Sequence, residues 1–219
     1  MSPIIVCIVG LAAGAVGAIT SLLLARRALS TQRAQLDELR GQARTDTLTG
    51  LANRRTWEEE LPRELARARR SGRPVSIVVA DLDGFKAVND TEGHQAGDRL
   101  LKTVAAAFRG CLREVDVVAR FGGDEFGFVL PDCREGEALK VAGRLRRAAP
   151  AGVTCSLGVA GWDGAEPASM LFERADQALY DAKHAGRNRV GASGLELRPA
   201  PFPRPWRDVG LQDLTPAPV

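Results

Sequence analysis

Two glycines stand between two apolar runs and are followed at once by two acids, in the string Gly122-Gly123-Asp124-Glu125. A Gly-Gly pair between strand-like segments predicts a β-hairpin, and a structural hairpin would account for the glycines alone. It does not account for adjacent carboxylates at the start of a buried strand, which are costly unless water or cations neutralise them. Glycines also let a backbone approach a flat base or a phosphate closely. The combination favours a site for a nucleotide with a bound metal ion.

A second pair of acids ends another apolar run. Residues 75–80 predict a short buried strand, and Asp81-Leu82-Asp83 follow at its end. Ligands of open sheets gather at strand ends, and Mg²⁺ prefers one or two carboxylates together with phosphate oxygens. Acids at such positions also commonly cap the next helix. Their presence together with Asp124 and Glu125 favours a shared metal site to which Asp81 contributes one carboxylate.

The elements that must position these acids alternate between helix and strand. Helices are predicted over residues 56–70, 98–108, 136–148 and 169–185, and strands over 75–80, 117–121, 126–130 and 153–160. This order predicts an α/β (α+β) sandwich whose central, mostly antiparallel sheet is flanked by helices.

The same segments resemble, in order along the chain, the motifs of the GGDEF family of diguanylate cyclases. The matching runs are DTLTGLANRR at 46–55, DLDGFKAVND at 81–90, Gly93-His94, Gly97-Asp98, RFGGDEF at 120–126, SLGVA at 156–160, and the stretch from Ala175 to Asn188. The resemblance covers about residues 46–190. It implies a GGDEF-type sandwich resembling the palm of nucleotidyl cyclases. It also implies an enzyme that condenses two GTP into cyclic di-GMP and releases diphosphate.

The resemblance implies a metal site and a catalytic base. Asp81, the backbone carbonyl of Leu82 and Asp124 would hold Mg²⁺, or Mn²⁺ as an alternative, with Glu125 as a further ligand. Asp124 is also a candidate for the base that takes the proton from the attacking 3′-hydroxyl. The sequence does not separate these two roles, nor does it decide between Asp124 and Glu125 as the base.

The resemblance also implies a set of substrate-binding residues, namely Asn89, His94, Asp98, Gly122, Gly123, Lys183 and Arg187. Asn89 and Asp98 would recognise the guanine edge, and His94 would lie near the nucleotide. Lys183 and Arg187 would neutralise the terminal phosphates, and their spacing of four predicts that they share one helical face.

A regulatory site is implied by Arg113-Glu114-Val115-Asp116, an RxxD string that ends five residues before Gly122. In the resembling family this string forms an inhibitory site for the product, and Arg144 on the following helix corresponds to a secondary arginine. Bidentate arginines suit a ring that carries two phosphates. A surface salt-bridge cluster would explain the same string without any ligand.

The N-terminus predicts a membrane anchor. Residues 1–25 carry no charged side chain, and a helix over 4–25 would reach about 33 Å, enough to cross a bilayer core. A cleaved signal peptide fits less well, because no basic segment precedes the apolar stretch. We therefore expect a transmembrane helix over 1–27. Arg26, Arg27 and Arg33 then predict a single-pass protein of the bacterial inner membrane with its catalytic domain in the cytoplasm.

The remaining domain organisation is predicted from composition and spacing. A linker over 28–45 carries a helical seam at Leu29, Gln32, Leu36, Leu39 and Ala43, either a coiled coil or a solvated helix. The catalytic domain is expected over 46–192 and a Pro-rich disordered tail over 193–219. Because each protomer would hold one GTP, the family mechanism implies a homodimer, which the linker would promote.

The bulk composition excludes one class of partner. The 219-residue chain has a net charge of only +3 with interspersed signs, which does not predict a nucleic-acid-binding surface. Its four cysteines are scattered without metal-ligand spacing and are best explained as free thiols. Two alternatives to the enzyme stay open, a catalytically silent cyclic di-GMP receptor and a transmembrane scaffold. The intact carboxylates of Asp81, Asp124 and Glu125 argue against the receptor, and a scaffold would leave the nucleotide-binding residues unexplained.

Overall fold

The structure is a computed structural model that describes Arg27 and residues 44–194. The predicted transmembrane helix over 1–27, the linker over 28–45 and the tail over 193–219 therefore lie almost wholly outside the described residues. Within the described part, no helix combines the length and the apolar character needed to cross a bilayer.

Six strands form one sheet in the order β1-β3-β4-β2-β5-β6. The strands are β1 (Ala52–Asn53), β2 (Val75–Asp83), β3 (Val117–Gly122), β4 (Glu125–Pro131), β5 (Thr154–Gly161) and β6 (Val190–Ala192). The four longer strands pair antiparallel, but β1 runs parallel to β3, and β6 runs parallel to β5. The sheet is thus mixed, and the expectation of a mostly antiparallel sheet is wrong. The two edge strands are too short to show any alternation of apolar and polar residues, so the sequence did not reveal them.

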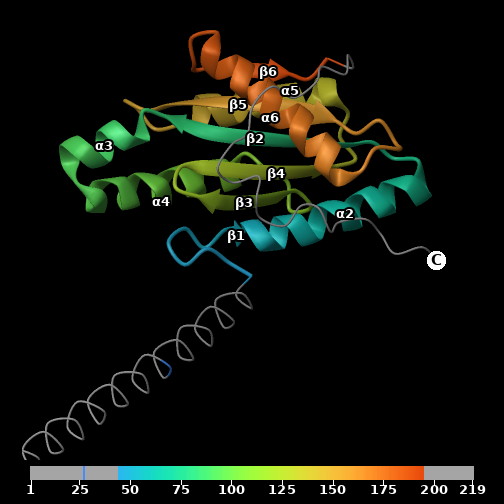
Figure 1. Cartoon of the computed structure of the whole chain (residues 1–219), viewed down its shortest axis with the longest axis horizontal. Coiled ribbons are helices and arrows are strands. Elements are labelled where there is room, and N and C mark those ends of the chain that lie inside the picture. Colours follow the sequence, from blue (N-terminus) through green and yellow to red (C-terminus); the bar gives the residue numbers. More distant parts are fainter. Residues whose placement is uncertain (1–26, 28–43, 195–219) are drawn as a thin grey trace, which may run out of the picture. The chain divides into compact units, whose positions relative to one another are not determined.

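Five described helices cover the two faces of this sheet (Figure 1). They are α2 (Arg54–Ser71), α3 (Phe85–Glu92), α4 (His94–Gly110), α5 (Glu135–Ala148) and α6 (Ala168–His184). The sequence predicts four of them to within a few residues, and α3 was not predicted as a helix. The flanking helices confirm the layered α/β class.

The central strand β2 shows how the layers are held together. Its residues Ile77 and Val79 belong to a core cluster with side chains of α2 and α6. Val78, Ala80 and Leu82 belong to a second cluster, with side chains of α3, α4 and α5. Successive side chains of a strand point to opposite faces, so a strand covered on both sides is mostly apolar and any buried polar side chain needs a hydrogen-bond partner. This explains why residues 75–80 are apolar except for Ser76, whose buried hydroxyl donates to the Cys133 carbonyl oxygen at 2.8 Å.

Helix α6 lies directly on the backbone of strands β5 and β6. A Cβ atom added at Gly158 of β5 would come within 2.0 Å of the carbonyl oxygen of Ala175. A Cβ atom added at Gly191 of β6 would come within 2.2 Å of the carbonyl oxygen of Ala178. The two glycines therefore set how closely α6 approaches the sheet.

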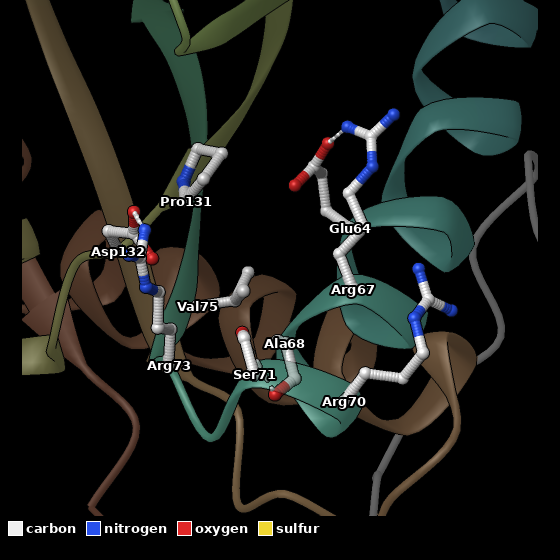
Figure 2. A pocket seen from close by; sticks show the side chains of 9 residues that line it. All are labelled: Glu64, Arg67, Ala68, Arg70, Ser71, Arg73, Val75, Pro131 and Asp132. Carbon is white, nitrogen blue, oxygen red and sulfur yellow. Dashed lines mark hydrogen bonds and ion pairs between the residues drawn. The ribbon is translucent and has the colours of Figure 1, made fainter.

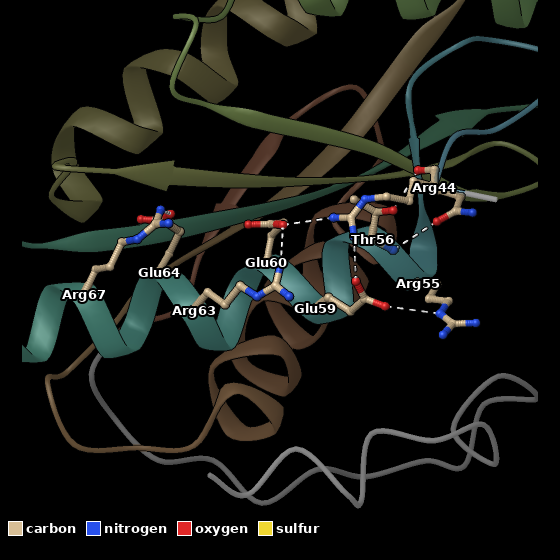
Figure 3. Close-up of polar contacts among 9 residues, drawn as sticks. Arg44, Arg55, Thr56, Glu59, Glu60, Arg63, Glu64 and Arg67 are labelled. Atoms are coloured by element: carbon tan, nitrogen blue, oxygen red, sulfur yellow. Dashed lines mark hydrogen bonds and ion pairs between the residues drawn. The ribbon is translucent and has the colours of Figure 1, made fainter. Parts of the chain in front are cut away.

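The start of the described domain is tied to α2 by Arg44 (Figure 3). The Arg44 guanidinium contacts Glu59 at 3.1 Å and Glu60 at 3.0 Å, and both pairs are partly exposed. Its carbonyl oxygen accepts hydrogen bonds from the Thr56 hydroxyl at 2.7 Å and from the Asn53 amide at 3.1 Å. Exposed ion pairs contribute little to stability, so the backbone contacts of Arg44 hold this segment more firmly than its charge does.

We expect Gly158→Ala to lower the free energy of unfolding by about 1–3 kcal/mol or more, because the new methyl group meets backbone atoms of α6 that cannot rotate away. Gly136→Ala is the matched control, since a Cβ atom there meets nothing within 4 Å. In that helical position alanine should be neutral or stabilising by up to about 1 kcal/mol. Urea unfolding of both variants measures the difference, and equal stabilities would contradict the close approach of α6.

Candidate active site

Strand pairing brings the predicted acids together at one end of β2. Asp81 of β2 lies opposite Glu125 of β4 in the antiparallel register. The Leu82 amide donates to the carbonyl oxygen of Asp124 at 3.2 Å, which places the turn before β4 beside the end of β2. Asp81 thus lies close to the adjacent acids Asp124 and Glu125, which are distant from it in sequence, where β2 ends and β4 begins.

Burial raises the pKa of all three carboxylates. Desolvation is the largest cause for Asp81, Asp124 and Glu125, and the charges of neighbouring acids raise the pKa of Asp81 and Glu125 further. Lys183 of α6 opposes this rise, because its Nζ atom lies 2.5 Å from Oδ2 of Asp81. One ammonium does not offset the desolvation of three acids, so each pKa stays above its usual value. The cluster therefore favours added positive charge.

The donor atoms fit a hard divalent cation that brings further ligands with it. Among residues 44–194, no three side chains of His, Cys, Asp or Glu are grouped as a complete metal centre. Asp81 and an acid of the Asp124-Glu125 pair provide two carboxylates beside exposed backbone. Such a partial oxygen set is the usual arrangement for a cation that also binds phosphates and water.

The Gly-Gly turn is held by a residue whose role the sequence analysis missed. Gly122 and Gly123 have φ values of 146° and 52°, which side-chain-bearing residues rarely adopt. The Arg120 guanidinium donates to the Gly123 carbonyl oxygen at 3.0 and 2.8 Å. The same guanidinium contacts the carboxylate of Asp46 at 3.1 Å. Arg120 therefore fastens the turn to the start of the domain.

Asp46 is charged in this contact. Burial alone would raise the pKa of Asp46, but hydrogen bonds from Thr49 and Arg120 outweigh it and lower that pKa. The Thr49 amide and hydroxyl donate to the carboxylate at 2.8 and 2.6 Å. The only sequence signal for this link was that Asp46 opens one matching motif and Arg120 opens another.

The residues expected to recognise guanine lie on α3 and α4. Asn89 is in α3, and His94 and Asp98 are exposed residues in the first turns of α4. A Cβ atom at Gly97 would come within 2.0 Å of Oδ1 of Asn89, so the missing side chain lets α3 close against α4. Asn89 thereby lies beside the turn of α4 that carries Asp98.

The two cations expected to bind phosphates do not share a helical face, and that prediction is wrong. Lys183 lies in the last turn of α6, but the helix ends at His184. Gly186, with φ of 114°, follows the end of the helix, and Arg187 has a left-handed φ of 60°. The Arg187 amide donates back to the Ala182 carbonyl oxygen at 3.1 Å, a common way to end a helix. Arg187 thus belongs to a tight turn rather than to α6.

The RxxD string forms a turn between α4 and β3. The Arg113 amide donates to Oδ2 of Asp116 at 2.8 Å, and Arg144 of α5 donates to the Cys111 carbonyl oxygen at 3.1 Å. Arg113 and Asp116 line a hollow of about 330 Å³. Burial raises the pKa of the nearby Cys133 thiol to about 11. The charges of Arg113, Asp116 and Arg144 also act on this thiol, which places all three residues near it. The three predicted residues therefore occupy one corner of the domain.

Comparison with protein families decides the identity. The family model "Diguanylate cyclase, GGDEF domain" matches residues 43–189. The chain belongs to this family. The resemblance read from the sequence motifs is confirmed. Proteins with this GGDEF domain generally use divalent metal ions, in agreement with the partial oxygen site at Asp81.

Two curated relatives and one solved structure define the similarity. The chain is 44% identical over 165 residues to the diguanylate cyclase DgcP of Pseudomonas aeruginosa. These aligned residues cover 71% of this chain and 25% of DgcP. It is 42% identical over 156 residues to the diguanylate cyclase DosC of Escherichia coli. These aligned residues cover 66% of this chain and 34% of DosC. The chain therefore spans about a quarter to a third of the length of these relatives.

The solved structure is the GGDEF domain of DgcB from Caulobacter crescentus in complex with c-di-GMP. It matches with a TM-score of 0.66 and 34% identity, over 68% of this chain and 93% of that chain. The GGDEF fold of the described domain is thus shared with a domain that binds this cyclic dinucleotide.

A separate hollow of about 440 Å³ lies at the opposite end of β2 in the GGDEF domain (Figure 2). Its lining includes Arg73, which pairs with Asp132 at 2.8 Å, and Arg67, which pairs with Glu64. Both guanidinium groups therefore have carboxylate partners within the hollow. None of the predicted site residues lines it, so it is not part of the acid cluster.

We expect Asp124→Asn to raise the metal-free melting temperature of this GGDEF domain. A carboxylate whose pKa is raised by folding destabilises the folded state while it is charged. A gain of about 1 kcal/mol corresponds to a rise of about 2–4 °C for a domain of this size. The gain should shrink as the pH falls through the raised pKa, because the wild-type carboxyl group is then neutral too. Differential scanning calorimetry at several pH values measures this.

Glu173→Gln is the matched control for that measurement, because Glu173 is exposed on α6 and lies outside the acid cluster. It should leave the melting temperature unchanged. A melting temperature of Asp124→Asn at or below that of the wild type in EDTA would contradict the desolvated acid cluster.

Proposed function

We propose that this chain is a diguanylate cyclase that joins two molecules of GTP into cyclic di-GMP and releases diphosphate. The observation that carries the proposal is the partly buried cluster of Asp81, Asp124 and Glu125 against Lys183. Relatives that share the GGDEF domain, DgcP and DosC, are named diguanylate cyclases. A silent receptor would not need carboxylates whose burial destabilises the fold.

Mg²⁺ is the proposed metal, with Mn²⁺ as a substitute. Asp81, the Leu82 carbonyl and Asp124 would hold it, with Glu125 as a further ligand. When bound, the metal supplies positive charge to the phosphates and to the transition state. Lys183 and Arg187 add charge at the terminal phosphates, while Asn89 and Asp98 hold guanine and His94 lies beside the nucleotide.

The chemical step is the attack of a 3′-hydroxyl on the α-phosphorus of a second GTP. The new bond joins the 3′-oxygen to phosphorus, and the bond to the diphosphate leaving group breaks. The hydroxyl proton passes to Asp124 or Glu125. Because burial raises the pKa of both carboxyls, each is a stronger base than an ordinary carboxylate, as general base catalysis near neutral pH requires.

A homodimer follows from the symmetry of this reaction. Each protomer would present one GTP, and the ring closes only when two sites face each other. The exposed Gly122-Gly123 turn allows a second nucleotide to approach without a side chain in the way. The helical seam within residues 28–45 is the proposed means of holding the two copies together.

Membrane anchoring is proposed from the apolar residues 4–25 and the arginines that follow them. The chain would cross the bacterial inner membrane once, with the GGDEF domain in the cytoplasm, where GTP and Mg²⁺ are present. The sequence is the only support for this part of the proposal.

Product inhibition is proposed at Arg113, Asp116 and Arg144. Three observations support it: the two arginines and the aspartate occupy one corner, a hollow lies beside them, and the similar DgcB domain was crystallised with c-di-GMP. Exposed guanidinium groups can bind the two phosphates of the ring in bidentate fashion.

The proposed activity is tested with residues 29–219, GTP and Mg²⁺. We expect cyclic di-GMP and two equivalents of diphosphate, both detected by chromatography. Asp124→Asn should lower turnover at least about 10³-fold while the domain stays folded, because a metal ligand and candidate base is lost. A folded dimer that forms no product at any Mg²⁺ or Mn²⁺ concentration would reject the cyclase, and retained binding of cyclic di-GMP would then favour the receptor.

Arg113→Ala should relieve product inhibition, seen as a progress curve that stays linear as cyclic di-GMP accumulates. Loss of one charge-assisted contact should raise the inhibitory concentration about tenfold or more. Arg147→Ala, which removes a guanidinium from the same helix as Arg144, should leave inhibition unchanged. Unchanged inhibition in Arg113→Ala would show that the RxxD string is only a structural turn.

A further inference from the structure

Asp83, the last residue of β2, is an acid to which the proposed mechanism gives no role. Its carboxylate accepts three hydrogen bonds from two other segments. Oδ1 accepts from the Ser156 hydroxyl at 2.8 Å. Oδ2 accepts from the Thr154 hydroxyl at 2.8 Å and from the Asn188 amide at 3.0 Å. Both carboxylate oxygens are therefore occupied by the protein itself.

The ordinary function of an acid at a strand end is excluded here. Such an acid often caps the following helix, but α3 begins after Gly84 and has no side-chain cap. Asp83 turns instead toward β5, where its strand partner is Thr154. The carboxylate thus reaches across β5 to the turn that joins α6 to β6.

That turn needs support from outside. Arg187 and Asn188 both have left-handed φ values, 60° and 45°, which are unfavourable for residues with side chains. Arg146 of α5 donates to the carbonyl oxygen and the side-chain oxygen of Asn188, at 3.2 and 2.8 Å. Asp83 and Arg146 therefore hold Asn188 from two sides, which fixes the position of the neighbouring Arg187.

We propose that Asp83 is a positioning residue that sets the place of the phosphate-binding cation Arg187 relative to the metal-binding Asp81. Asp81 and Asp83 lie two residues apart on one strand and point to the same face. The distance between the metal site and the anchored turn is thus set by a rigid segment of backbone. The inference rests on the proposed function, because it assigns Arg187 to the terminal phosphates of GTP.

The test compares the binding of two nucleotides that differ only in their phosphates. The α,β-methylene analogue of GTP, which cannot be turned over at the α-phosphate, and GMP are titrated by calorimetry with Mg²⁺. Asp83→Asn removes the negative charge, so the Asn188 N–H keeps at most a neutral acceptor whichever way the amide is oriented. We expect the analogue to bind about tenfold more weakly, the loss of one hydrogen bond to a charged group, and GMP to bind within about twofold of wild type.

Two further variants isolate the turn. Arg146→Ala removes the second support of Asn188 through a half-buried side chain, and it should weaken the analogue selectively while the domain stays folded. Thr154→Val is the matched control, because it removes one hydrogen bond to Asp83 but keeps the bond to Asn188. It should leave the ratio of the two affinities close to that of wild type.

Several outcomes overturn the inference. Equal weakening of the analogue and GMP would indicate a general structural role for Asp83. A raised Mg²⁺ requirement in Asp83→Asn would indicate a metal ligand. If the wild type makes cyclic di-GMP but both Asp83→Asn and Arg146→Ala leave the affinity ratio unchanged, the inference is rejected and the proposed function stands. A wild type that makes no cyclic di-GMP and does not prefer the analogue over GMP rejects the proposed function together with it.

Discussion

The constraint on which the rest of the site depends is the desolvation of three carboxylates where β2 ends and β4 begins. The strand register that places Asp81 opposite Glu125 also removes water from both carboxylates. A positive charge nearby is therefore needed to stabilise them in their charged form. Lys183 delivers it from α6, across the face of the sheet. That helix can reach Asp81 because Gly158 and Gly191 let it rest on bare backbone. The close packing of α6 on the sheet is thus needed to bring the Lys183 charge to the acids.

A second set of contacts orients the turn that carries the acids. Arg120 binds the Gly123 carbonyl and Asp46 together, so the Gly-Gly turn is fastened to the segment where the domain begins. Asp46 keeps its charge there because hydrogen bonds outweigh its burial and lower its pKa. The position of the Gly-Gly turn is therefore linked to the position of Asp46 through one guanidinium group.

Much of the site was predictable because its residues stand in contiguous motifs. The acids after the Gly-Gly pair and at the end of residues 75–80 could be paired on chemistry alone. What escaped prediction depends on contacts between distant segments or on very short elements. β1 and β6 have too few residues to show a period, so the mixed sheet was missed. Regular spacing placed Arg187 on a helix that ends at His184, and no sequence pattern indicated the contacts of Asp83 with β5.

The resting ion pair between Lys183 and Asp81 has a consequence for what the site admits. A bare divalent cation that takes the Asp81 oxygen paired with Lys183 displaces the ammonium, which then keeps only its coulombic attraction to Asp124 and Glu125. In the proposed function, a triphosphate that carries its own cation would exchange partners, since the cation would take the carboxylate and a phosphate would take the ammonium. The number of opposite-charge contacts then rises by one, whereas a bare cation leaves it unchanged. In the proposed cyclase, the pair would thus favour a metal ion that arrives with the nucleotide over a free metal ion.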